Sequence, residues 1–163
     1  MSKIANMLLI DEGFREKPYL DSLGYPTVGI GQRIGPKGAS LSQYTFTVPR
    51  SVALLWADEH AAMVRQQLAS SAALKPIWGA LNEARQDALI NMGYQLGADG
   101  STKGIWAFKK MLAAVRAQDW STALKEGRDS LWHSQTKARS ERVLGVLFNG
   151  DYRTYEGLSG WER

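Results

Sequence analysis

The sequence predicts an α+β fold that is mainly α, with a small lobe built on a β-hairpin sheet and a larger helical lobe joined to it by a long helix. Helical apolar periodicity runs through most of the chain from about residue 49 onward. β-Branched and aromatic residues flank a turn in the short stretch between residues 19 and 30. With 163 residues, 44% of them hydrophobic, the chain has the makeup of one ordinary globular domain. We expect the small lobe at about 13–55 and the helical lobe at about 1–12 plus 56–163.

The first predicted helix ends in two acidic residues, Asp11 and Glu12, just before Gly13 as a cap. Glu12 takes the i+7 place of an apolar stripe that begins at Ala5. A carboxylate in the last turn also lies at the negative end of the helix dipole, which costs roughly 0.3–1 kcal/mol. Both features disfavour its ionised form. Asp11 completes an equally good stripe that begins at Ile4, so spacing alone leaves both acids open.

A turn of sequence DSLG follows, with Asp21 at the first position of a type I turn and Gly24 at the fourth. Strand-forming residues flank the turn on both sides, which predicts a β-hairpin. Gly29 and Gly31 alternate within the second strand. Because glycines inside a strand mark a close approach of another backbone or a ligand, we expect this face to form the floor of a groove.

Two carboxylates of this kind, one at a helix end and one on a facing hairpin, are what acid-catalysed cleavage of an acetal requires. One carboxyl holds a proton for the leaving oxygen, while the other stays ionised beside the developing positive charge or activates a water. Each residue also has a structural interpretation, because Glu-Gly is a common helix stop and Asp-x-x-Gly is a common turn. The pattern alone leaves both interpretations open.

A long helix is predicted from about Pro49 to about Ser70. About 20 residues of helix reach about 30 Å, which is long enough to connect two lobes with a cleft on one side. Its apolar stripe is expected to comprise Val52, Leu55, Trp56, Ala62, Met63 and Leu68.

A buried helix is predicted from Glu83, with Asn82 as its cap and Gly97 as its stop. It is apolar nearly all round, except for Asn91 and Gln95, which share a face. Buried amides need partners, so these two side chains either satisfy backbone groups or border the cleft. Further helices are expected near 105–116, 120–128, 137–148 and 152–157, with caps at Asp119, Thr136 and Asp151 and with Trp106, Phe108, Trp120, Trp132 and Phe148 in the core.

The composition excludes several classes of function. The chain contains no cysteine, hence neither a disulfide framework nor a thiolate metal site. Only His60 and His133 remain as nitrogen ligands, far apart in the sequence, so we expect no metal and no cofactor. Residues 29–34 lack the third glycine of a dinucleotide-binding loop, and neither a P-loop nor a G-x-S-x-G motif occurs.

The net charge of +4 and the pI near 9.4 favour an anionic partner. Basic residues are interleaved with acidic ones, which disfavours a specific nucleic-acid site and suits peptidoglycan. The apolar run near the N-terminus covers only residues 7–10, whereas a signal peptide needs about 7–15 apolar residues. No run of about 18 apolar residues occurs that could span a membrane, so we expect no membrane insertion.

The stretch LLIDEGFREKPYLDSLGYPTVGIG closely resembles the opening of the lysozymes of T-even bacteriophages, the phage-type muramidases of glycoside hydrolase family 24. Their pattern is a helix that ends in E-G, an aspartate nine residues later, and T-x-G-x-G. The resemblance continues at 73–97, 120–123 and 132–143, and so covers nearly the whole chain. It implies a two-lobed lysozyme-like fold and selects Glu12 over Asp11.

The resemblance also implies roles for individual residues. Glu12 matches the general acid, Asp21 the second carboxylate, and Thr27 the hydroxyl that helps to hold the attacking water. Arg139 and Asn91 match supporting residues of the cleft, where the arginine faces the catalytic glutamate. The implied sugar contacts are Gly31, Gln32, Arg33, Tyr94, Gln95 and Phe108, and Gln32 stands where the T-even lysozymes have a histidine.

Members of this family cleave the β-1,4 bond between N-acetylmuramic acid and N-acetylglucosamine and resemble inverting enzymes, whose carboxyls stand about 6.5–9.5 Å apart. By resemblance, we expect a monomeric bacteriophage endolysin, made in the host cytoplasm, that degrades periplasmic peptidoglycan during host cell lysis. A holin is the implied partner, because the enzyme needs a permeabilised membrane to reach the wall. Two alternatives stay open: a virion-associated lysozyme that opens the wall at infection, and a non-catalytic peptidoglycan-binding protein of the same fold. A nucleic-acid-binding protein is a more distant third.

Overall fold

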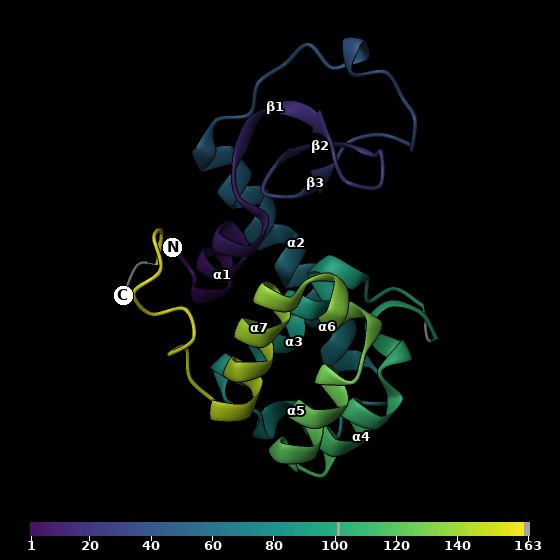
Figure 1. The fold of residues 1–163 in the computed structure, drawn as a ribbon, viewed down its shortest axis with the longest axis vertical. Helices are drawn as coiled ribbons and strands as arrows, with labels where there is room; N and C mark the ends of the chain where they lie inside the picture. The colour runs from purple at the N-terminus through teal and green to yellow at the C-terminus, as the bar shows by residue number, and fades with distance from the viewer. Residues whose placement is uncertain (101, 162–163) are drawn as a thin grey trace. The chain divides into compact units, whose positions relative to one another are not determined.

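The computed structural model of the protein describes residues 1–100 and 102–161. Within these residues the chain forms seven α-helices and one three-stranded antiparallel sheet, which confirms the predicted α+β, mainly α class (Figure 1). Backbone contacts divide the chain into two units. Among the described residues, the sheet unit comprises Met1–His60 and residues 158–161, and the helical unit comprises Ala61–Gly157. The predicted lobes group residues 1–12, 56–60 and 158–161 differently.

Helix α1, Lys3–Glu12, opens the sheet unit and begins at Ser2, whose hydroxyl accepts a backbone N–H of the first turn. The helix ends at Glu12 because Gly13 takes a φ of 72°, and its N–H closes the last turn. The buried residues of α1 are Ile4, Ala5, Asn6, Met7 and Leu8. Glu12 therefore lies in the last helical turn, as predicted.

The sheet has the order β1-β2-β3. The strands are β1 at Arg15–Leu20, β2 at Pro26–Gly29 and β3 at Gln32–Arg33. The predicted turn joins β1 to β2, because the N–H of Gly24 donates to the carbonyl of Asp21 at 3.0 Å. All four residues of β2 are buried, and Arg33 of β3 pairs opposite Thr27. The middle strand is thus the most buried one, with the edge strands on its two sides (Figure 1).

Helix α2, Arg50–Ser70, confirms the predicted long helix, and the boundary between the two units falls inside it. Its predicted apolar stripe is confirmed only at Leu68, which is buried, and is wrong at the other five positions, Val52, Leu55, Trp56, Ala62 and Met63, which are all exposed. The remaining buried positions are Ala53, Ala57, Ala61 and Val64. A small residue is needed at Ala53, where the sheet approaches closely: a Cβ added to Gly29 would lie 3.1 Å from the Cβ of Ala53.

The helical unit is built around α3, Glu83–Leu96, as the sequence predicted. Asn82 caps its start by accepting the N–H of Arg85, and Gly97 ends it. Residues 87–94 are all buried. This helix packs against α7, Lys137–Asn149, so that the two form the core of the unit (Figure 1).

The other helices of this unit confirm most of the predicted ranges. They are the short 3-10 helices η2 Trp78–Ala80 and η3 Gly104–Ala107 and the α-helices α4 Lys109–Arg116, α5 Trp120–Arg128 and α6 Leu131–Gln135. The sheet unit contains a further short 3-10 helix, η1 Leu41–Gln43. Helix α7 also contacts α5 and α6, while α4 packs on α5. Asp119 caps α5 as predicted, accepting the N–H of Thr122 at 3.0 Å. No helix among the described residues is both long and apolar enough to cross a membrane.

Three predictions in this unit are wrong. Residues 152–157 form turns, and Asp151 therefore begins no helix. Thr136 stands at the start of α7, but its hydroxyl donates to a carbonyl of α6 instead of capping α7. Phe148 is 40% exposed and not part of the core.

Candidate active site

Glu12 lies at the end of α1, where the turn between β2 and β3 comes against its carboxyl group. Gly31, in that turn, has a φ of 69°, and a Cβ added to it would lie 2.9 Å from Oε2 of Glu12. Only a glycine leaves this space to the carboxyl group without strain. The bare strand face expected from the alternating glycines is therefore occupied by Ala53 of α2 at Gly29 and by Glu12 at Gly31.

Asp21 is fixed at the start of the β1–β2 turn through both of its carboxylate oxygens. Its Oδ1 accepts the backbone N–H of Leu23 at 2.9 Å and that of Tyr25 at 2.8 Å. Its Oδ2 lies 3.3 Å from Nε of Arg33. Partial burial raises the pKa of Asp21, but the two N–H donors and Arg33 outweigh this and hold the pKa below its usual 3.8. This carboxyl group is therefore ionised at neutral pH.

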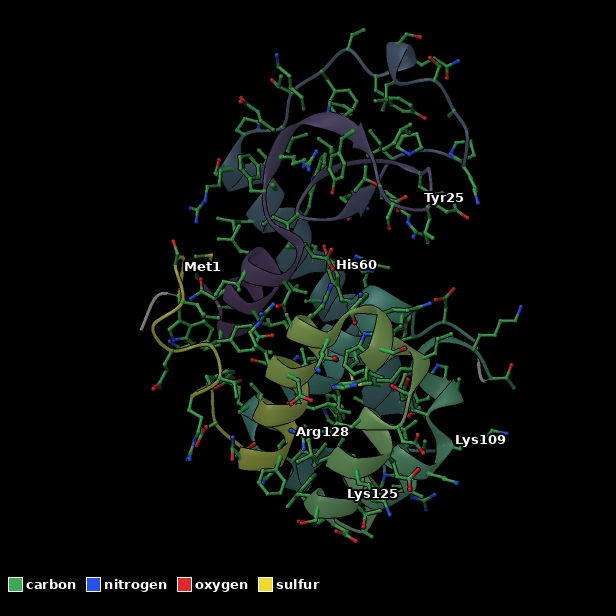
Figure 2. All side chains as sticks on the ribbon, viewed as in Figure 1. Met1, Tyr25, His60, Lys109, Lys125 and Arg128 are labelled. Carbon is green, nitrogen blue, oxygen red and sulfur yellow. The ribbon has the colours of Figure 1, made fainter. Side chains whose placement is uncertain are left out.

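Thr27 lies on β2 with only 2% of its surface exposed. Its hydroxyl donates to the carbonyl of Tyr25 at 3.0 Å, and the same carbonyl accepts the N–H of Asp21 at 2.9 Å. The backbone of Tyr25 thus connects the hydroxyl of Thr27 to the carboxylate of Asp21 at the corner of the sheet unit that carries the Tyr25 label in Figure 2.

Tyr19 of β1 lies within electrostatic reach of both predicted catalytic carboxylates. Burial raises the pKa of its hydroxyl above 10.0, and the negative charges of Glu12 and Asp21 add to this rise. The sheet unit therefore gathers Glu12, Asp21 and Thr27 around one hairpin. Sequence reasoning did not single out Tyr19, although this aromatic residue stands two positions before the predicted catalytic Asp21.

Gln32 and Arg33, two of the predicted sugar contacts, form strand β3. Gln32 pairs opposite Val28, and its side-chain amide reaches the carbonyl of Arg33 at 3.4 Å. The guanidinium of Arg33 stacks on the ring of Tyr25, with 4.2 Å between Cζ and the ring centroid. Both residues therefore lie beside the strand that carries Thr27.

In the helical unit, Asn91 and Arg139 form a buried pair between α3 and α7. Nε and one terminal nitrogen of Arg139 donate to Oδ1 of Asn91 at 3.1 and 2.9 Å. Gln95, one turn further along α3, accepts the indole N–H of Trp132 at 2.8 Å. The two amides of α3 are thus bonded to side chains of α6 and α7. That Arg139 faces Glu12 stays a prediction.

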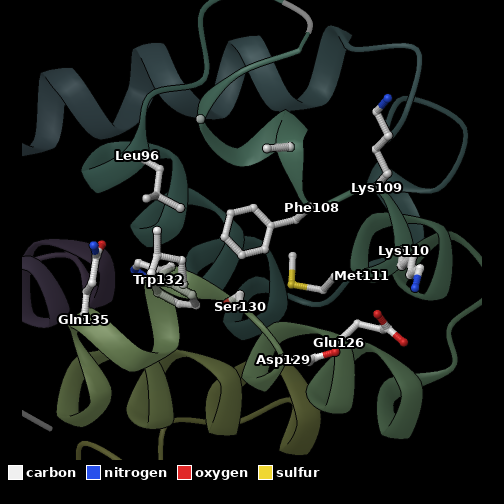
Figure 3. A pocket seen from close by; sticks show the side chains of 13 residues that line it. Leu96, Phe108, Lys109, Lys110, Met111, Glu126, Asp129, Ser130, Trp132 and Gln135 are labelled. Carbon is white, nitrogen blue, oxygen red and sulfur yellow. The ribbon is translucent and has the colours of Figure 1, made fainter.

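A pocket of about 720 Å³ opens in the helical unit around Phe108 (Figure 3). The rings of Phe108 and Trp132 meet edge to face, with 5.9 Å between their centroids. Lys109 and Lys110 lie on one side of Phe108, and Glu126 and Asp129 lie on another (Figure 3). The pocket is lined by Leu96, Gly104, Ala107, Phe108, Lys109, Lys110, Met111, Glu126, Asp129, Ser130, Leu131, Trp132 and Gln135. Sequence reasoning assigned Trp132 to the core alone, and the ring is indeed 5% exposed, but it also forms a wall of this pocket.

The model of the phage lysozyme family matches residues 10–147. The chain belongs to the phage lysozyme family. The chain is 35% identical to the pre-baseplate central spike protein Gp5 of Enterobacteria phage T4 over 168 residues, covering 93% of the chain but only 28% of the spike protein. It is also 30% identical to probable T4-type lysozymes 1 and 2 of Dictyostelium discoideum, with 96% of the chain and 99% of each relative covered.

Family membership makes the protein a glycoside hydrolase and confirms the resemblance drawn from its opening stretch. The matched segment begins at Ile10 and so includes Glu12, Asp21 and Thr27. Among the described residues, no group of three or more His, Asp or Glu side chains is placed to hold a metal ion.

Proposed function

We propose that the protein hydrolyses the β-1,4 bond between N-acetylmuramic acid and N-acetylglucosamine in peptidoglycan, with Glu12 as general acid and Asp21 as the second carboxylate. The observation that carries the proposal is the placement of two carboxyl groups around one hairpin. Asp21 receives two N–H donors and a guanidinium, which favour its ionised form. Glu12 ends helix α1, and its carboxyl group lies against Gly31 in the turn between β2 and β3. Two carboxyl groups on one hairpin, one of them held ionised, suit one acid and one base.

The chemistry follows from these assignments. Glu12 donates its proton to the glycosidic oxygen as the bond to the anomeric carbon breaks, and a water attacks that carbon from the opposite face. Asp21 accepts a proton from this water. The hydroxyl proton of Thr27 is already used on the carbonyl of Tyr25, so the oxygen of Thr27 offers lone pairs to a water O–H. The product has inverted configuration, which requires about 6.5–9.5 Å between the two carboxyls.

Sugar binding is proposed for residues of both units. Gly31, Gln32 and Arg33 flank the proposed catalytic residues on the sheet unit. Phe108 offers an aromatic surface in its pocket, with amide and charged groups of neighbouring residues at the edges, which suits an amphipathic sugar ring. We assign Tyr94 and Gln95 to the same function by their match to the family, and Asn91 and Arg139 to support of the site.

The biological role we propose is that of an endolysin, which acts as a monomer on the periplasmic wall during host cell lysis after a holin has permeabilised the membrane. A virion-associated role is the second candidate, and the similarity to a phage spike protein favours it. Both roles use the same chemistry, so the enzymatic test below applies to both.

The test compares the wild type with Glu12→Gln in clearing chloroform-permeabilised Gram-negative cells, with identification of the reducing ends released. The matched control is Glu16→Gln, which removes one negative charge from an exposed position four residues away. We expect wild type and Glu16→Gln to release N-acetylmuramic acid ends and Glu12→Gln to release none, a loss of at least about 100-fold for a missing general acid.

Two other outcomes would contradict the proposal. A wild type that binds the wall and releases no sugar would support the non-catalytic wall-binding protein. Equal clearing by Glu12→Gln and wild type would show that Glu12 is not the acid, and Asp11→Asn would then be tested in the same assay.

A further inference from the structure

We propose that Arg33 positions the carboxylate of Asp21 and that the ring of Tyr25 holds Arg33 in place. This role is additional to the proposed contact of Arg33 with the sugar. The inference rests on the proposed function, because it gives Arg33 a role in the reaction assigned to Asp21. It differs from a sugar contact in acting through the carboxylate, and the two roles have different kinetic signatures.

The first observation is that Arg33 completes the fixation of Asp21. The backbone of the turn holds only Oδ1, through the N–H groups of Leu23 and Tyr25. Oδ2 is left for Nε of Arg33, which lies 3.3 Å away. With one oxygen tied to the turn and the other to β3, rotation of the carboxylate about its terminal torsion is restricted. A base that must face one attacking water needs this restriction.

The second observation is that Arg33 is itself held. Its Cζ lies 4.2 Å from the centroid of the Tyr25 ring, and its backbone is paired opposite Thr27 in the sheet. Tyr25 therefore has three contacts with this group: its N–H binds Asp21, its carbonyl binds the hydroxyl of Thr27, and its ring carries Arg33. A planar guanidinium can stack on a ring and bind a carboxylate at once, which a lysine ammonium does less well.

Other titratable groups surround Asp21 on the neighbouring elements. Tyr19 on β1 interacts with it through charge, and Lys37 lies beside the turn, with its side chain 3.9 Å from a Cβ added to Gly24. Among the described residues, Arg33 forms an ion pair with this carboxylate and Lys37 does not. The side chain of Arg33 is 52% exposed, so the pair contributes little to folding. We expect the ion pair to affect the pKa of Asp21 and the rate of hydrolysis, and both can be measured precisely enough to detect a small change.

The direct test is the titration of the Asp21 carboxyl by carbon-13 NMR in the Glu12→Gln background, which needs no turnover. We expect Arg33→Gln to raise the midpoint by about half a pH unit, the size of an exposed ion pair. Tyr25→Leu, which removes the ring but keeps the backbone contacts, should raise it in the same direction. Arg33→Lys should restore part of the shift, and Lys37→Gln, which removes one positive charge near the same turn, should leave the midpoint within about 0.1 unit.

The kinetic test uses soluble peptidoglycan fragments with Glu12 intact. We expect Arg33→Gln to lower kcat several-fold and to move the acid limb of the pH profile upward by the NMR shift, with KM changed less than kcat. A rise in KM at every pH with an unmoved acid limb would show a sugar contact and overturn the inference.

Failure of the inference and failure of the proposed function are distinguishable. An Asp21 titration unchanged in Arg33→Gln overturns the positioning role, while the proposed function stands as long as the wild type releases reducing ends. A wild type that releases none overturns the proposed function and the reaction role of Arg33 with it, whatever the Asp21 titration shows.

Discussion

The site depends on small features at single residues, and Gly31 is the clearest. Its φ of 69° lies in the left-handed region, and the place of its absent Cβ is filled by the Glu12 carboxyl. Gly38 has a similar φ of 80° but nothing within 4 Å of a Cβ. A substitution at either glycine introduces backbone strain, but only the one at Gly31 also contacts Glu12. Comparing the two variants therefore separates the effect of strain from the effect of the contact.

We predict that Gly31→Ala lowers kcat at least about tenfold, because the new methyl group displaces Oε2 of Glu12 from its place. Gly38→Ala should leave kcat unchanged. Both variants should lose about 1–2 kcal/mol of unfolding free energy, since alanine is strained at a positive φ. Steady-state kinetics and urea unfolding measure the two effects. Equal kcat in both variants would show that the Glu12 carboxyl group can shift away from the new methyl group without loss of catalytic rate.

The residues of the site were predictable only in part. The turn at Asp21 followed from D-S-L-G, because an aspartate at the first position and a glycine at the fourth favour one turn type. The contact between Asp21 and Arg33 did not follow, since it joins residues on different strands and needs the register of β2 with β3. The contacts of Tyr25 could not be predicted for the same reason, because its N–H binds Asp21 and its ring stacks with Arg33 of another strand.

At the scale of elements, helix ends were predicted better than helix faces. Asn82, Gly97 and Asp119 mark helix ends through local hydrogen bonds, which depend on neighbouring residues alone. The face of α2 was wrong because large apolar side chains such as Leu55 were assumed to be buried. Small residues such as Ala53 occupy much of the buried face instead, and the sheet approaches closely at Ala53. Helix α6 was missed because its five residues are too few for a periodic pattern.

Three helices of the helical unit contribute to a charged cluster centred on Glu141 of α7. Arg128 of α5 donates to both carboxylate oxygens at 2.9 and 2.7 Å, and Nε2 of His133 on α6 lies 2.6 Å from Oε1. The hydrogen bonds from Arg128 lower the pKa of Glu141 from 4.5 to about 2. A carboxyl with a depressed folded pKa stabilises the fold above its unfolded pKa, and this stability is lost as pH falls from 4.5 towards 2.

We predict that Glu141→Gln lowers the free energy of unfolding by about 1 kcal/mol at neutral pH, a discounted value because the side chain is 36% exposed. The difference from wild type should shrink as the pH falls below about 4.5. Guanidinium unfolding at several pH values measures it, with Glu156→Gln as a control for the loss of an exposed carboxylate outside the cluster. A difference that is constant down to pH 2 would show that the contact with Arg128 does not lower the pKa of Glu141.

At the scale of the whole molecule, the sequence was most informative where a motif extended over many residues. The match to the family begins at Ile10 and ends at Leu147, so it includes the catalytic pattern and the helices of the second unit. Local periodicity gave the class of the fold, and the family pattern gave the chemistry. Buried polar networks between distant segments were beyond both, because they depend on how the elements pack. Asp87 is the main example.

Asp87 connects three segments of the helical unit and is only 1% exposed. It binds Arg65 of α2 at 3.1 Å and the hydroxyl of Tyr152, in the C-terminal turns, at 2.8 Å. Burial raises its pKa from 3.8 to about 6, although both partners act in the opposite direction. The folded state therefore binds a proton more tightly than the unfolded state between these pH values, so the contribution of Asp87 to stability falls as pH rises from about 4 to about 6.

We predict that Asp87→Asn, which cannot ionise, removes this dependence. Relative to the variant, the wild type should lose on the order of 2 kcal/mol of unfolding free energy between pH 4 and pH 6, the amount expected for a shift of this size. Tryptophan fluorescence during guanidinium unfolding at each pH measures the difference, and Asp99→Asn, at an exposed position of the same unit, is the matched control. With rising pH, Asp87 lowers the free energy of unfolding whereas Glu141 raises it. One pH series with both variants therefore distinguishes the contributions of the two carboxyl groups. A wild type that gains stability over Asp87→Asn as the pH rises would show that Arg65 and Tyr152 outweigh burial and keep Asp87 ionised in the fold.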